Sequence, residues 1–120
     1  MSEIKVIKTE WAERDNYVCL LYDGDVFKGI VEVSVHKEKK EAYIWNLNVE
    51  EEHRGNGLGR ELLGKALSIA GERGCGEVKL DWDLRDSPRW VLDWYVRNGF
   101  DDREFGNGCA LMVKSLTTKK

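Results

Sequence analysis

Hydrophobic and polar residues alternate along the first half of the chain, as they do in half-buried strands. This pattern predicts strands over 4–8, 17–22, 26–35 and 42–49. Asp23-Gly24 lies between the second and third of them and is a typical two-residue hairpin turn. The polar stretch between the first two strands has room for at most one turn of helix. On the fourth strand, four bulky residues are expected to share one side: Tyr43, Trp45, Leu47 and Val49.

The hydrophobic period then changes to three and four residues, which predicts an amphipathic helix over 57–73. Gly64 and Gly71 each weaken such a helix by about 1 kcal/mol relative to alanine, so we expect them to allow close packing on a sheet. Alternation returns over 77–82 and predicts a fifth strand.

A second helix is expected to begin at Ser87-Pro88, with serine as the N-cap and proline in the first helical position. Gly99 is expected to end it. Short strands are predicted over 100–104 and 109–116. The fold class is therefore α+β, a single domain over 1–120 with a mixed, mostly antiparallel sheet and one β-α-β crossover.

The amino-acid composition excludes several classes of protein. Hydrophobic residues make up 42% of the 120 residues and charged residues 34%, which excludes a disordered chain. The net charge of −3 and pI near 5.5 argue against nucleic-acid binding. No apolar run approaches the length of a membrane span, which about 18 residues would require. Most of the five tryptophans are expected in the core, with one or two at a groove or an interface.

Cysteines and histidines indicate neither disulfides nor metal. The three cysteines, Cys19, Cys75 and Cys109, are widely spaced, as expected for reduced, buried thiols of a cytoplasmic protein. His36 and His53 have no neighbour at metal-ligand spacing, so no metal site is expected.

The most informative stretch lies between the fourth strand and the first helix. It places Gly55, Gly57 and Gly59 between Arg54 and Arg60. Closely spaced glycines leave backbone amides uncovered, and a helix N-terminus adds partial positive charge, so the stretch can bind a pyrophosphate. The dinucleotide fingerprint is disfavoured because Arg60 stands where its last glycine would be. The P-loop is disfavoured because it ends in Gly-Lys-Ser/Thr.

This stretch resembles the Q/R-x-x-G-x-G/A signature of the GNAT superfamily of N-acetyltransferases. Residues 92–100, which read LDWYVRNGF, are similar to the closing stretch of that family. The resemblance covers roughly residues 17–116 and implies the GNAT fold. It also implies acetyl-CoA as acyl donor and direct transfer to a primary amine of a small molecule, peptide or protein.

The same resemblance implies roles for particular residues. The pyrophosphate of acetyl-CoA would be bound by backbone amides of the loop, namely Arg54, Gly55, Asn56, Gly57, Leu58, Gly59 and Arg60. Leu47 and Val49 would offer backbone groups to the pantetheine arm, where their strand separates from 77–82. An amide near Val49 would polarise the thioester carbonyl, and Tyr95 would protonate the departing thiolate.

Three departures from the family pattern accompany these roles. At the positions of the usual base the chain has Tyr43 and Trp45, so the base is left open between Glu32, Asp81, Asp83 and water. Two helices that usually form a wall of the acceptor site are missing between the first two strands, which suggests an open groove or a homodimer formed through a sheet edge.

The third departure concerns Pro88, which stands where the family often has an asparagine that contacts the cofactor. Ser87 could substitute there as a hydrogen-bond donor, and Arg89 could pair with a phosphate.

Two other functions remain as alternatives. One is a non-catalytic module that binds CoA or acetyl-CoA and regulates a partner protein. The other is a nucleotide-binding protein of a different fold.

Overall fold

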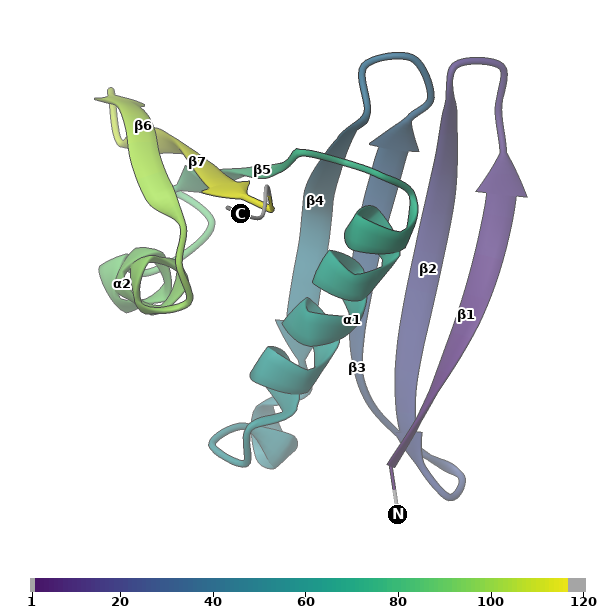
Figure 1. Cartoon of the computed structure of the whole chain (residues 1–120). Coiled ribbons are helices and arrows are strands. Elements are labelled where there is room, and N and C mark those ends of the chain that lie inside the picture. The colour runs from purple at the N-terminus through teal and green to yellow at the C-terminus, as the bar shows by residue number, and fades with distance from the viewer. Residues whose placement is uncertain (1, 117–120) are drawn as a thin grey trace.

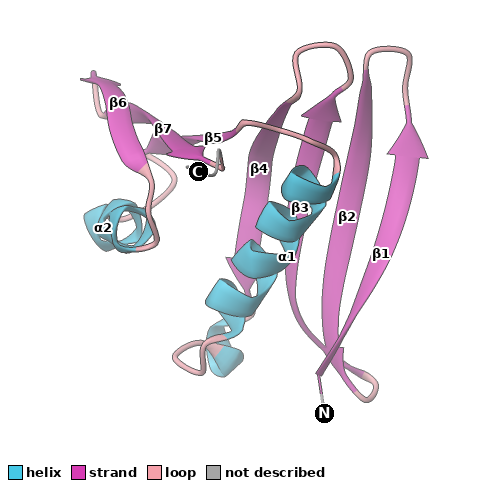
Figure 2. Ribbon diagram, viewed as in Figure 1, coloured by secondary structure: helices cyan, strands magenta, loops and turns pink. Residues whose placement is uncertain are grey.

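The computed structural model describes residues 2–116, with the side chains of 102–105 excepted. Seven strands form one sheet: β1 (Ser2–Glu10), β2 (Arg14–Asp23), β3 (Val26–His36), β4 (Glu41–Val49), β5 (Glu77–Asp83), β6 (Asp101–Gly106) and β7 (Cys109–Ser115). The helices are the short 3₁₀ helix η1 (Glu51–His53), α1 (Leu58–Glu72) and α2 (Arg89–Arg97). Figure 1 shows α1 lying across β2–β4, and Figure 2 shows α2 beside the smaller group of β5, β6 and β7.

The sheet order is β1-β2-β3-β4-β5-β7-β6. Only β4 and β5 pair in parallel, and α1 forms the crossover between them. The predicted order of strands and helices and the mixed α+β class are therefore confirmed.

Helix α1 packs on one face of β2–β4 through its predicted apolar side. Its buried residues are Leu62, Leu63, Ala66, Ile69 and Ala70. On the facing strands, Val31, Val33 and Val35 are fully buried, as their alternation predicted. The packing expected of Gly64 and Gly71 is wrong, because a Cβ at either position would meet nothing within 4 Å. Both lie on the exposed side of the helix.

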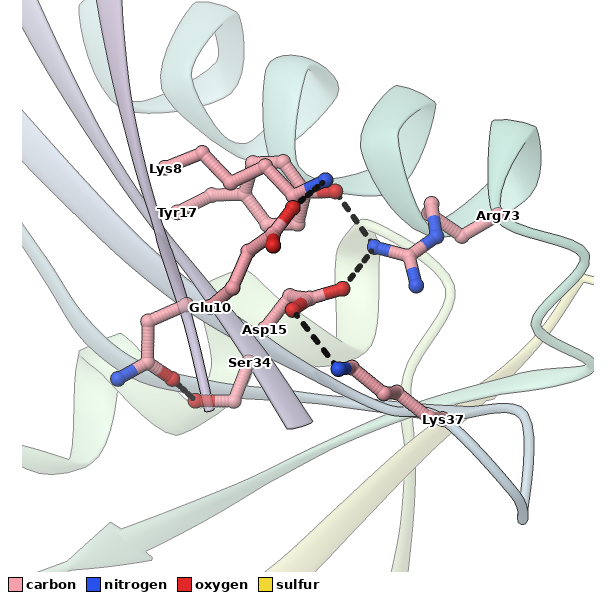
Figure 3. Close-up of polar contacts among 8 residues, drawn as sticks. Lys8, Glu10, Asp15, Tyr17, Ser34, Lys37 and Arg73 are labelled. Atoms are coloured by element: carbon pink, nitrogen blue, oxygen red, sulfur yellow. Dashed lines mark hydrogen bonds and ion pairs between the residues drawn. The ribbon is translucent and has the colours of Figure 1, made fainter. Parts of the chain in front are cut away.

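No helical turn forms between the first two strands, in keeping with the expectation of at most one, but both strands extend further than predicted. The β1–β2 ladder runs from Ser2↔Asp23 to Glu10↔Asp15, and the Trp11 amide closes the hairpin on the Arg14 carbonyl at 2.9 Å. The polar residues of this stretch continue the strands because Asp15 is anchored from outside the hairpin. Its carboxylate is 3% exposed and lies 2.9 Å from Arg73, at the C-terminal end of α1 (Figure 3).

The same carboxylate is held from a second side by Lys37 at 3.7 Å. Arg73 also donates a hydrogen bond to the Tyr17 hydroxyl at 2.6 Å (Figure 3). These contacts fasten the end of α1 to β2 and to the β3–β4 turn, on the side of the sheet that α1 covers.

A β-bulge at Trp45 changes which residues of β4 share a face. Val33 pairs with Ile44 and Glu32 with Asn46, so Trp45 is the extra residue. Before the bulge, Ala42 and Ile44 are buried under α1, and after it Leu47 and Val49 take that side, opposite Val31 and Gly29. The expectation that Tyr43, Trp45, Leu47 and Val49 share one side is therefore wrong.

Helix α2 begins one residue later than expected. Pro88 is the N-cap, with extended backbone, and no side chain caps the helix, so Ser87 does not have the predicted role. The Trp82 indole donates a hydrogen bond to the Pro88 carbonyl at 3.3 Å, which ties the start of α2 to β5. Gly99, with φ of +96°, ends the helix as predicted.

The expectation that most tryptophans lie in the core is wrong. Trp82 is 3% exposed, whereas Trp11, Trp45 and Trp90 are each more than half exposed. Trp94 is half-buried against the core.

Candidate functional site

Strands β4 and β5 pair only over their first three residues, Glu41–Tyr43 with Glu77–Lys79. Beyond this point they separate, as Figure 1 shows. The expected separation of these strands is thus present. A cleft of 310 Å³ opens between them, within the range of small-molecule sites.

The cleft is lined from both faces of the sheet. Leu80, Val91 and Tyr95 line it on the side that carries the helices. Tyr43 and Asp81 line it on the other side, since Tyr43 pairs with Lys79 and Asp81 is two residues further along β5. The cleft is thus bordered by side chains from both faces of the sheet.

The glycine loop, residues 54–60, follows the short helix η1, which comes directly after β4. Gly55 and Gly57 have φ of +86° and +80°, a left-handed conformation that favours glycine. Gly57 is the N-cap of α1, and no side chain caps the helix. The amides of Leu58, Gly59 and Arg60 belong to the first turn, where no helical carbonyl can accept from them. These donors and the positive end of a 15-residue helix suit an anion.

Contacts with β4 and α2 hold the loop beside the cleft. Leu47 lines the cleft, and Val49, two residues later, contacts the Gly59 position. A Cβ on Gly59 would lie 3.5 Å from the Trp94 ring of α2. The predicted cofactor residues of β4 and of the loop are therefore brought together along one edge of the cleft.

Arg54 makes contacts that the sequence did not predict. Its guanidinium donates to the Val49 carbonyl at 2.8 Å and to the Asn48 side-chain oxygen at 3.3 Å. Arg54 thus holds the loop against the end of β4, and the Val49 carbonyl is engaged. Asn56 and Arg60 are exposed.

Tyr95 lies on α2 with 8% of its surface exposed. Its ring packs edge-to-face on Phe100, with centroids 5.5 Å apart. This contact depends on Gly99, whose turn lets the Phe100 amide donate to the Tyr95 carbonyl at 3.1 Å. Burial raises the pKa of Tyr95 to about 12, so its hydroxyl keeps its proton at neutral pH.

The three candidate bases have different surroundings. Asp83 is held by the Arg85 guanidinium, with the shortest contact at 2.7 Å, and these hydrogen bonds lower the pKa of Asp83 well below its usual range. Glu32 accepts from the Asn46 amide at 2.7 Å and does not line the cleft. Asp81 is exposed, lines the cleft and makes no ion pair with any residue that the structure describes.

The partner of Asp81 is a residue that sequence reasoning set aside. The Tyr43 hydroxyl donates a hydrogen bond to the Asp81 carboxylate across the opening of the cleft. Burial and this hydrogen bond raise the pKa of Tyr43, so it remains a donor. The sequence assigns Tyr43 no catalytic role, because a tyrosine at this position is not a base, and the contact joins residues 38 positions apart in the sequence.

Among the side chains that the structure describes, no group of His, Cys, Asp and Glu is arranged to hold a metal ion. The three cysteines are free; Cys19 and Cys75 are buried, as expected, and Cys109 is half-buried. None of the described helices is both long and apolar enough to cross a membrane.

Comparison with known proteins agrees with this geometry. The Acetyltransferase (GNAT) family matches residues 2–100. An uncharacterized N-acetyltransferase of Methanocaldococcus jannaschii is 34% identical over 80 residues, which are 66% of this chain and 34% of that protein. Streptothricin acetyltransferase of Streptomyces lavendulae is 33% identical over 91 residues, 76% of this chain and 47% of that protein. The chain thus spans between a third and half of the length of these relatives.

Among solved structures, the PaiA N-acetyltransferase of Thermoplasma acidophilum, in complex with coenzyme A, has the same fold. The TM-score is 0.70 at 19% identity, covering 86% of this chain and 61% of that chain.

Proposed function

Because this chain belongs to the GNAT acetyltransferase family, we propose that it transfers an acetyl group from acetyl-CoA directly to a primary amine. The observation that carries the proposal is the cleft between β4 and β5. One proton donor, Tyr95, and one carboxylate, Asp81, line it from opposite faces of the sheet.

The donor side of the cleft fits acetyl-CoA. The first-turn amides of α1 would bind its pyrophosphate, and Arg54 would keep the loop in place through Val49. The pantetheine arm would follow β4 past Leu47, where the strand has no neighbour on its β5 side. An amide near Val49 would stabilise negative charge on the thioester oxygen.

The acceptor would enter from the opposite face, beside Tyr43 and Asp81. An alkylamine has a pKa near that of lysine, about 10.4, so it arrives protonated and must lose a proton before it attacks. Asp81 would take this proton, directly or through water, while Tyr43 orients the carboxylate through its hydrogen bond. Of the three carboxylates, Asp81 lines the cleft without a cationic partner, whereas Asp83 is held by Arg85 and Glu32 lies outside it.

The transfer itself forms one bond and breaks one. The free amine attacks the thioester carbon, the C–N bond forms, and the C–S bond then breaks. Tyr95 would give its proton to the departing thiolate, the nitrogen would release its second proton to solvent as it becomes the amide, and Tyr95 would regain a proton from solvent. No covalent enzyme intermediate is needed.

The non-catalytic alternative rests on a specific observation. β1 leads directly into β2 by a hairpin, so among the described residues no helical pair walls the acceptor side. A module that only binds acetyl-CoA would have the same loop and cleft.

One experiment separates the two functions. Thermal unfolding is measured with and without acetyl-CoA, and thiol release is then followed over a panel of amines and lysine-containing peptides. Ligand at 100 times its Kd should stabilise the fold by about 2.7 kcal/mol. Stabilisation with amine-dependent thiol release supports the enzyme, and stabilisation without it on any acceptor supports the module. Stabilisation by ATP or NAD but not by acetyl-CoA would exclude both.

A further inference from the structure

A second hollow, of 510 Å³, lies on the face of the sheet that α1 does not cover. It is lined by residues at consecutive register positions of β2, β3 and β4 and by Lys79 of β5. Its volume is that of a small-molecule site. Neither the glycine loop nor Tyr95 lines it, so the acetyl-CoA side of the molecule does not account for it.

The hollow is positively charged in a chain whose net charge is negative. Arg14 and Lys39 line it, and neither makes an ion pair with another described residue. Lys79 is paired with Glu41 at 3.2 Å, so these four side chains leave two positive charges. The hollow is thus suited to an anion.

Its floor adds neutral hydrogen-bond donors. The Ser34 hydroxyl donates to the Asn16 side-chain oxygen, which leaves the Asn16 amide nitrogen as a further donor. Asn16 and Ser34 face each other across β2 and β3 on the uncovered side. Amide N–H groups and cations together are the groups that bind a carboxylate.

Two aromatic residues connect the hollow to the cleft. Tyr43 and Trp45 line both, and Trp45 is 51% exposed because the bulge places it outside the ladder. Lys79 at the hollow and Asp81 at the cleft are successive residues on one face of β5. Asn16 lies in the register row of Lys79 but on β2, three strands away, which corresponds to roughly 14 Å across the sheet. The anion-binding groups on β2 and the carboxylate on β5 are therefore separated by Tyr43 and Trp45 and by a distance that an extended peptide of a few residues spans.

We propose that this hollow binds a carboxylate of the acceptor, so that the acceptor is a short peptide carrying both the reacting amine and a carboxylate. This inference rests on the proposed function, because it takes Asp81 as the site of the amine. The carboxylate would lie between Arg14, Lys39 and Asn16, and the connecting chain would pack on Trp45.

The test uses ω-amino acids of increasing length, from 6-aminohexanoate to 12-aminododecanoate, each matched with its uncharged ω-amino amide. The two members of a pair carry the same amine and differ in one negative charge. Calorimetry measures their Kd on the whole chain, without and with CoA. The Kd of each acid should be about tenfold or more lower than the Kd of its amide, as expected for hydrogen bonds to a charged group. High salt should reduce this preference for the acid.

Lys39→Gln and Arg14→Gln should each reduce that preference several-fold without changing the affinity for the amide. Lys65→Gln, which removes the same charge from α1 on the other face, is the control and should leave the preference intact. Equal binding of acid and amide by the native chain, or a preference that survives in both variants, would overturn the inference. Failure of the proposed function is read separately, as absence of acetyl-CoA stabilisation or of thiol release.

Discussion

The Tyr43 hydroxyl donates a hydrogen bond to the Asp81 carboxylate at the point where β4 and β5 separate. Tyr43 is the last residue of β4 that pairs with β5, and Asp81 is the first residue on the same face of β5 beyond the paired segment. The hydrogen bond therefore fixes a carboxylate at the opening through which an acceptor would reach the cleft.

Asp81→Asn should lower kcat/KM for amines by about 10² or more, the usual contribution of a general base. Acetyl-CoA affinity should be unchanged, because Asp81 lies on the face opposite the glycine loop. Glu32→Gln is the matched comparison, since Glu32 is bound to Asn46 outside the cleft, and it should change the rate little. Steady-state kinetics over pH measure both variants; equal losses would remove Asp81 from the mechanism.

Tyr43→Phe should keep the Asp81 carboxylate but release it from its orienting hydrogen bond. We expect a smaller loss of kcat than for Asp81→Asn, because the carboxylate itself remains. A purely structural role for Tyr43 would lower thermal stability and leave kcat of the folded enzyme unchanged in steady-state assays.

Tyr95→Phe should reduce kcat by about 10² without unfolding the chain, because general acids contribute at least this much and the ring contacts with Phe100 are kept. In the native enzyme, kcat/KM should rise with pH as the amine deprotonates. Ionisation of Tyr95 should not lower kcat/KM until the pH nears the Tyr95 pKa of about 12. Kinetics with donors of differing leaving-group pKa measure the role, since a thiol of low pKa needs the acid least. Equal rates for both proteins with every donor would contradict it.

The same tyrosine affects stability at high pH. Its pKa is higher in the folded chain, about 12, than the ordinary value of 10.0. The folded state therefore holds this proton more tightly, and its contribution to stability is present below about pH 10 and lost as the pH rises through the folded value. Urea unfolding at increasing alkaline pH should show a loss of unfolding free energy, and this loss should be smaller in Tyr95→Phe than in the native chain. Parallel losses in the two proteins would mean that another group is responsible.

Gly57→Ala should weaken acetyl-CoA binding while the fold is retained. The left-handed φ of +80° costs a non-glycine residue about 1–3 kcal/mol, so the loop would shift and its amides would lose their direction. Loss of one hydrogen bond to a charged phosphate corresponds to at least about a tenfold rise in Kd. Gly64→Ala is the control: it lies on the exposed side of α1, meets nothing, and should stabilise the protein by about 1 kcal/mol. Unchanged affinity in Gly57→Ala would place the pyrophosphate elsewhere.

Asp15→Asn should destabilise the fold by about 2 kcal/mol, the value of a hydrogen bond between charged groups, because Arg73 loses its carboxylate at the end of α1 (Figure 3). Asp25→Asn, on an exposed side chain at the β2–β3 turn, should change stability little. Chemical unfolding measures both. Similar stability in the two variants would show that the Asp15 cluster does not fasten the helix.

Local patterns in the sequence determined the order of the elements and the place of the glycine loop. The 3.6-residue period of α1, the alternation that buries Val31, Val33 and Val35, and the glycines at 55 and 57 act between near neighbours in the chain. Such features depend on backbone preferences and on one apolar face, so they can be recognised before any tertiary contact is known.

Only the tertiary structure decided which side chains meet. The bulge at Trp45 moves Leu47 and Val49 to the α1 face, and it results from pairing with β3 rather than from any residue preference within β4. Arg85 neutralises Asp83 as a candidate base, whereas Asp81 is bound by Tyr43, 38 residues away. The positively charged hollow likewise combines residues of four strands. Register and long-range contacts depend on the packing of the whole sheet, because a shift of one residue in a strand changes the face of every side chain after it.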